Sequence, residues 1–92
     1  MAYKLLIVED EKEKATGIAY LTGKYNPECR PVLLAHDGRE GYEKAAAEQP
    51  DIIVTDIRMP EMDGLEMIRE LKKAGCSAEF IVLSGYAEFS YA

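Results

Sequence analysis

The apolar residues of this chain gather into four short runs instead of alternating with polar residues. The runs are LLIV at 5–8, VLLA at 32–35, DIIVT at 51–55 and FIVL at 80–83. Short continuous runs of this kind are typical of strands that are covered on both faces, because neither face has to offer polar side chains to water. The pattern therefore predicts four buried strands.

The segments between these runs carry the spacing of amphipathic helices. Apolar or small residues recur three and four positions apart, which places them on one side of a helix. The positions that follow this spacing are Ala15, Ile18, Ala19 and Thr22, then Tyr42, Ala45 and Ala46, then Met67, Ile68, Leu71 and Ala74. We predict one helix in each segment.

Residues that favour the ends of helices flank two of these segments. Asp37 with Glu40 three residues later resembles a capping pair, and Asp63 is suited to an N-cap. Gly75 suits the position just after a helix, where the backbone is often left-handed. Pro31 and Pro50 come just ahead of predicted strands, where a missing N–H group does little harm.

The predicted elements alternate between strand and helix along the whole chain, and YAEFSYA at 86–92 begins a further helix. Such alternation implies right-handed crossovers and a parallel sheet with helices on both faces. With 92 residues, no internal repeat and no linker, the chain is expected to form one domain, 1–92. The predicted fold class is α/β.

Charge and composition exclude several classes of protein. The net charge of -6 disfavours direct binding of nucleic acid, since affinity for the phosphate backbone depends on Lys and Arg. No apolar run approaches the roughly 20 residues that cross a bilayer, so no membrane contact is expected. The N-terminal segment turns acidic too early for a signal peptide, which favours a cytoplasmic protein. Cys29 and Cys76 lack metal-ligand spacing and are expected to be reduced thiols.

Acidic and hydroxyl side chains follow the carboxyl ends of the predicted strands, the edge at which open parallel sheets bind ligands. Carboxylates about 4 Å apart repel each other by about 4 kcal/mol at an effective dielectric near 20, so such a cluster needs a cation. Oxygen ligands suit Mg²⁺, which bridges carboxylates to phosphoryl groups, and an aspartate can itself accept a phosphoryl group. The residues at this edge are Glu9, Asp10 and Glu11 after the first strand, Asp56 after the third, and Ser84 and Gly85 after the fourth.

Three motifs carry a resemblance to a known family. LLIVEDE, IIVTDIRMPEMDGLEMI and IVLSGYAEFSYA resemble the first, third and fourth strand regions of the receiver domain of two-component response regulators. The DIRMPEMDG segment is the most specific, and the match in order and spacing covers essentially the whole chain. The resemblance implies a flavodoxin-like open parallel sheet in the strand order 2-1-3-4, with the fifth strand missing.

The resemblance also implies a phosphoacceptor and a metal site. Asp56 is expected to take a phosphoryl group from a partner sensor histidine kinase. Asp10, Asp56 and the backbone carbonyl of Arg58 are expected to bind Mg²⁺ directly, while Glu9 acts nearby or through water.

The remaining expected roles concern the surroundings of Asp56. Ser84 matches the hydroxyl residue that hydrogen-bonds the phosphoryl group and reports phosphorylation, and Gly85 matches the small residue beside it. Met59 and Pro60 are expected to shape the loop after Asp56.

The sequence departs from the family pattern in two places. Glu9 and Asp10 stand where the family usually has two aspartates, and the longer Glu9 is expected to serve as well. Family members continue through a fifth strand that ends in a lysine, and no lysine of this chain stands at that place. We therefore expect a fragment of a longer transcriptional regulator that has a C-terminal DNA-binding effector domain outside this chain. If the chain is instead an incomplete receiver on its own, its unprotected FIVL strand is expected to cause oligomerisation, such as a homodimer, strand exchange or poor solubility.

Single residues and the whole chain also allow other interpretations. The acids at 9–11 could form a solvated helix cap, and Asp56 could simply end a strand, but the motif argues against both. His36 is expected to be a solvent-exposed loop residue. The main alternative function is a docking or dimerisation module that keeps the fold without phosphotransfer.

Two enzyme classes fit the residues less well, so we expect a signalling domain that catalyses at most its own phosphorylation and dephosphorylation. An aspartate-dependent phosphatase would need an acid two residues after Asp56, where this chain has Arg58. A flavin-binding protein would need a loop that accepts phosphate after the first strand, but EDEKEK would repel it.

Overall fold

The computed structural model describes residues 1–83, and the helix expected at 86–92 lies outside that range. The elements alternate as predicted, and no helix within the described residues is long and apolar enough to span a membrane. In chain order they are β1 (Tyr3–Val8), α1 (Lys12–Tyr25), β2 (Cys29–Ala35), α2 (Gly38–Glu48), β3 (Ile52–Asp56), α3 (Gly64–Lys73) and β4 (Glu79–Leu83).

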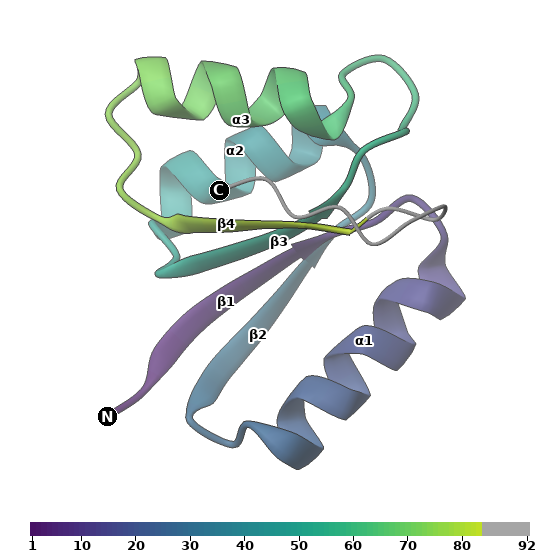
Figure 1. The fold of residues 1–92 in the computed structure, drawn as a ribbon, viewed down its shortest axis with the longest axis vertical. Coiled ribbons are helices and arrows are strands. Elements are labelled where there is room, and N and C mark those ends of the chain that lie inside the picture. The colour runs from purple at the N-terminus through teal and green to yellow at the C-terminus, as the bar shows by residue number, and fades with distance from the viewer. Residues whose placement is uncertain (84–92) are drawn as a thin grey trace.

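The four strands form one parallel sheet in the order β2-β1-β3-β4 (Figure 1). Its register is regular at the centre, where Leu6 of β1 lies opposite Leu33 of β2 and Ile53 of β3. Because all strands run in one direction, their carboxyl ends meet at the same edge of the sheet. The predicted fold and strand order are confirmed.

The helices cover both faces of the sheet, with α1 on one side and α2 and α3 on the other (Figure 1). Strand β1 serves both layers, because successive side chains of a strand point to opposite faces. Leu5 and Ile7 pack in the cluster that includes Ile18 of α1, whereas Leu6 and Val8 pack with the α2 and α3 side chains. Burial on both faces explains why this strand reads as a continuous apolar run.

The predicted helix ends are confirmed. The Asp37 side chain accepts a hydrogen bond from the backbone N–H of Glu40 at 2.7 Å and so caps α2. Asp63 and Glu66 form a complete capping box at the start of α3. Gly75 follows the last turn of α3 with φ +88°, a left-handed conformation that glycine adopts without steric cost.

Strand β2 begins earlier than the sequence predicted, and Pro31 lies inside it rather than ahead of it. The register between β1 and β2 shifts there, since Tyr3 pairs with Cys29 but Leu5 pairs with Val32. Within residues 1–83, β2 is an edge strand, so a proline without an N–H group is tolerated at this irregularity. The apolar pattern missed these residues because Arg30 and Pro31 interrupt it.

The loop between β3 and α3 folds back on the end of β3. The N–H group of Gly64 donates to the carbonyl oxygen of Ile57 at 2.8 Å, and Met59 is buried in the core. A Cβ atom on Gly64 would overlap the carbonyl oxygen of Asp56, so only glycine fits this approach. The start of α3 is therefore pressed against the residue that ends β3.

We expect Gly64→Ala to destabilise the fold by about 1–3 kcal/mol, because the added methyl group would force the backbone of Asp56 and α3 apart. Gly17→Ala is a matched control, because a Cβ atom there meets nothing within 4 Å in the interior of α1. It should stabilise the protein by roughly 0.5–1 kcal/mol through helix propensity. Urea unfolding measures both values, and equal effects at the two sites would contradict the close approach.

Candidate functional site

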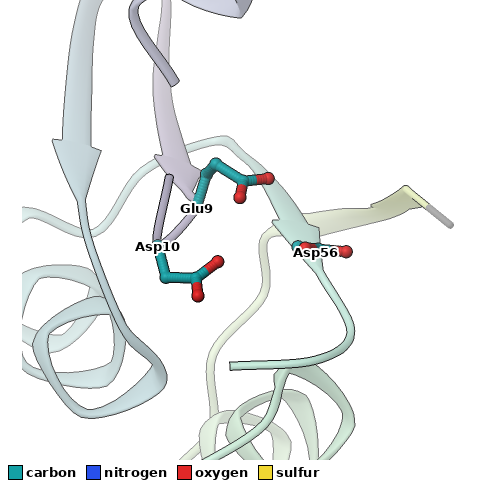
Figure 2. A group of neighbouring side chains, drawn as sticks. All are labelled: Glu9, Asp10 and Asp56. Atoms are coloured by element: carbon teal, nitrogen blue, oxygen red, sulfur yellow. The ribbon is translucent and has the colours of Figure 1, made fainter. Parts of the chain in front are cut away.

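The ends of β1 and β3 bring three carboxylates together. Glu9 and Asp10 follow β1, and Asp56 is the last residue of β3. One oxygen atom from each lies within 4.8 Å of the other two (Figure 2). The neighbouring register produces this meeting, because Val8 and Thr55, the residues just before Glu9 and Asp56, are paired across the two strands.

Glu9 is the most deeply buried member of this acidic cluster, with 1% of the residue exposed. Its Oε2 atom accepts a hydrogen bond from the N–H group of Glu11 at 3.1 Å. Its Oε1 atom has no hydrogen-bond partner within the described part of the chain, although the ammonium group of Lys14 lies 3.6 Å away. A buried carboxylate oxygen in this state is costly unless a further positive group satisfies it.

Burial raises the pKa of Glu9, and the neighbouring charge of Asp56 raises it further. The N–H group of Glu11 and the ammonium group of Lys14 act in the opposite direction and lower that pKa. The net upward shift of the pKa means that a negative charge on Glu9 is costly in the folded chain, chiefly because the carboxylate is buried. A hard divalent cation with oxygen ligands fits the cluster, because it would satisfy Glu9 Oε1 and offset the repulsion.

Asp56 is half-buried, and its side chain is fixed by its own loop. Its Oδ1 atom accepts a hydrogen bond from the N–H group of Ile57 at 2.8 Å. The hydroxyl group of Thr55, which is fully buried, donates to the Asp56 carbonyl oxygen at 2.8 Å. These bonds and the approach of Gly64 hold the carboxylate at the edge of the sheet.

His36 is half-buried, so the prediction of a solvent-exposed loop residue is wrong. The Nδ1 atom of its ring lies 3.3 Å from the carbonyl oxygen of Glu9, and its backbone N–H group donates to Glu40 Oε1 at 2.8 Å. The N–H group of Glu9 in turn donates to the carbonyl oxygen of Ala35 at 2.9 Å. Ala35 at the end of β2 and His36 just after it therefore contact the backbone N–H and carbonyl groups of Glu9, and so brace its backbone.

The other expected site residues lie around the loop after Asp56 or outside the described residues. Arg58 is exposed, Met59 is buried in the core, and the exposed Pro60 accepts a hydrogen bond from the N–H group of Met62 at 2.8 Å. Ser84 and Gly85 fall outside residues 1–83. Their functional roles stay predictions.

Two contacts of Glu9 were not predicted from the sequence, namely the ion pair with Lys14 and the contact with the His36 side chain. Lys14 reaches Glu9 across the junction between β1 and α1, where helical spacing does not apply. Glu11, which the sequence grouped with the acids, is the N-cap of α1 and makes no side-chain capping bond. The only available signal for Lys14 was a positive charge close to an acidic run.

The raised pKa of Glu9 predicts a stability difference that depends on pH. Below the ordinary value of 4.5 both the folded and the unfolded chain hold the proton, so Glu9 carries no penalty. As pH rises from there through the raised pKa, the unfolded chain ionises more readily and the folded state loses stability. We therefore expect metal-free Glu9→Gln to become more stable relative to the unmutated protein over that range.

Urea unfolding at a series of pH values measures this difference. Glu13→Gln is the matched control, since it removes an exposed carboxylate from the first turn of α1, and it should show no comparable rise. A difference that stays flat or falls as pH rises would contradict the proposed cost of ionising Glu9.

The model of the response regulator receiver domain family matches residues 5–92. The chain is 41% identical over 90 residues to the uncharacterized transcriptional regulatory protein YesN of Bacillus subtilis. The matched region covers 98% of this chain and 24% of YesN. The chain thus spans about a quarter of the length of that relative, as the 24% coverage shows.

Two solved structures share the fold at substantial identity. The N-terminal domain of an uncharacterized protein from Wolinella succinogenes has a TM-score of 0.83 and 38% identity, covering 95% of this chain and 68% of that one. A two-component transcriptional regulator from Clostridium phytofermentans has a TM-score of 0.80 and 33% identity, covering 94% of this chain and 69% of that one. The family match over nearly all residues, together with the fold, shows that this chain belongs to the receiver domains of two-component response regulators.

Proposed function

We propose that this receiver domain accepts a phosphoryl group on Asp56 from a partner histidine kinase in a step that depends on Mg²⁺. The acidic cluster carries this proposal, because Glu9, Asp10 and Asp56 place oxygen atoms within 4.8 Å of one another at the carboxyl edge of the sheet. Such a cluster has the charge and the ligand type for a hard cation beside a nucleophilic carboxylate.

A carboxylate oxygen of Asp56 attacks the phosphorus atom while the phosphorus–nitrogen bond of the phosphohistidine breaks. The imidazole of the kinase leaves, and Asp56 becomes an acyl phosphate. The hydrogen bond from the Ile57 N–H group to Asp56 Oδ1 limits the rotation of this side chain and so favours one direction of attack.

Asp10, Asp56 and the backbone carbonyl of Arg58 would hold Mg²⁺, with Glu9 acting through a bound water molecule. The ion would neutralise the carboxylates and the charge that develops on the phosphoryl oxygens. Glu9 suits a supporting role, because its backbone is braced by Ala35 and His36 and its Oε1 atom is buried without a hydrogen bond among residues 1–83.

Phosphorylation would then change the output of a longer regulator. Ser84 would hydrogen-bond the phosphoryl group, with Gly85 beside it, while Met59 and Pro60 shape the loop after Asp56. Transcriptional regulators among the relatives favour a C-terminal effector domain that binds DNA. The net charge of -6 argues against direct DNA contact by this domain.

We expect one phosphoryl group to be added when the protein is incubated with a small acyl-phosphate donor and Mg²⁺. Asp56→Asn should abolish the gain, because an amide is not a competent nucleophile. Removal of Mg²⁺ with a chelator should slow the gain more than about tenfold, since no divalent cation would then offset the charges of the carboxylates and of the phosphoryl group. Intact-mass spectrometry measures all three results.

Glu43→Gln is a suitable control, because Glu43 is an exposed acid on α2 that pairs with Arg39 away from the cluster. It should be phosphorylated like the unmutated protein. Uptake that persists in Asp56→Asn, or that does not depend on Mg²⁺, would contradict the proposed site. Metal binding without any phosphoryl uptake would instead favour the docking or dimerisation module.

A further inference from the structure

Lys14 lies beside the most deeply buried acid of the site. Its Nζ atom is 3.6 Å from Glu9 Oε1, and the side chain of Lys14 is 42% exposed whereas that of Glu9 is only 1% exposed. The pair thus joins a carboxylate with almost no exposed surface to an ammonium group that is partly exposed. Glu9 is held in place by the end of β2, so Lys14 is the partner that is free to move.

The oxygen atom that faces Lys14 is the one without a hydrogen bond within residues 1–83, Glu9 Oε1. The same carboxylate belongs to the acidic cluster with Asp10 and Asp56. An ammonium group and a divalent cation near one carboxylate repel each other, and each would offset the same negative charge. The two cations therefore compete for Glu9.

We propose that Lys14 is an internal counter-ion of the acidic cluster, which offsets the charge of Glu9 when no metal is bound and lowers the affinity of the site for Mg²⁺. This inference rests on the metal site of the proposed function. Lys14 acts through Glu9 and touches no reacting group, so it is a positioning and tuning residue.

Lys12 provides a matched control for the charge of Lys14. It stands two positions earlier on α1, is exposed, and forms no ion pair with any residue in the described range 1–83. Residues two apart on a helix point in different directions, so Lys12 does not share the surroundings of Lys14. Replacing either lysine changes the net charge of the protein by the same amount.

The first test is a calorimetric titration of MgCl₂ into the unmutated protein, Lys14→Met, Lys14→Arg and Lys12→Met at constant ionic strength. We expect Lys14→Met to bind Mg²⁺ about three- to tenfold more tightly, because the ammonium group that competes with the ion for Glu9 is gone. Lys14→Arg, which keeps the charge, and Lys12→Met should both stay within about twofold of the unmutated protein. Lys14→Gln is a second neutral variant should Lys14→Met fold poorly.

A second test asks whether the effect passes through Glu9. In a Glu9→Gln background the carboxylate charge for which the two cations compete is absent. Lys14→Met should then change the Mg²⁺ affinity by less than about twofold, and this loss of coupling is a result that a purely structural role of Lys14 would not produce.

A third test follows the metal-free protein by thermal unfolding. Lys14→Met should melt at a lower temperature than Lys12→Met, because it leaves the buried Glu9 charge without a partner. Saturating Mg²⁺ should raise the melting temperature more for Lys14→Met than for the unmutated protein, since tighter binding to the folded state adds more stability.

Equal Mg²⁺ affinities for Lys14→Met and Lys12→Met, or weaker binding by Lys14→Met, would overturn the counter-ion role. The proposed function would stand in that case, provided that the unmutated protein still binds Mg²⁺ and phosphorylates at Asp56. Absence of Mg²⁺ binding in every variant would overturn both, because no metal site would then exist for Lys14 to tune.

Discussion

The constraint on which this structure depends is the cost of holding several negative charges together at one edge of a sheet. Two carboxylates about 4 Å apart repel by about 4 kcal/mol at an effective dielectric near 20, and burial adds a desolvation penalty. Both costs apply to Glu9, since it is 1% exposed and belongs to a cluster with Asp10 and Asp56. Burial and, to a lesser extent, the charge of Asp56 raise the pKa of Glu9.

The scaffold holds the charges in place through contacts with the backbone. The N–H group of Glu9 is bonded to Ala35, its carbonyl oxygen lies near His36 Nδ1, and Asp56 Oδ1 accepts the N–H group of Ile57. These partners come from β2, from the loop after it and from the loop after β3. The sheet therefore fixes the spacing of the carboxylates before any cation enters.

The loop after β3 connects this site to the packing of the helices. Gly64 lets α3 begin directly against the carbonyl of Asp56, and Met59 anchors the loop in the core shared with α2 and α3. A glycine at position 38 allows an equally close approach of α2 to the Met62 backbone. A change of charge or ligation at Asp56 thus acts on a segment that has little room to adjust without moving its neighbours.

The sequence alone determined the order of strands and helices, because burial on both faces leaves continuous apolar runs and helices leave their own spacing. It also indicated which acids would share an edge, since parallel strands bring their carboxyl ends together, and the DIRMPEMDG motif indicated the family. The caps at Asp37 and Asp63 could be predicted from the sequence, because a capping side chain bonds to the backbone only three residues further along the chain.

Only the tertiary structure decided which of these residues actually touch. The extension of β2 through Pro31, the contact of His36 with Glu9 and the ion pair of Lys14 with Glu9 all depend on how neighbouring strands and the first helix are aligned. The burial of Glu9 also depends on this alignment. The sequence alone does not distinguish an acid at a strand end that is exposed to water from one that neighbouring residues cover. The spacing of residues along the chain does not determine such contacts, because they form between segments that only the packing of the folded chain brings together.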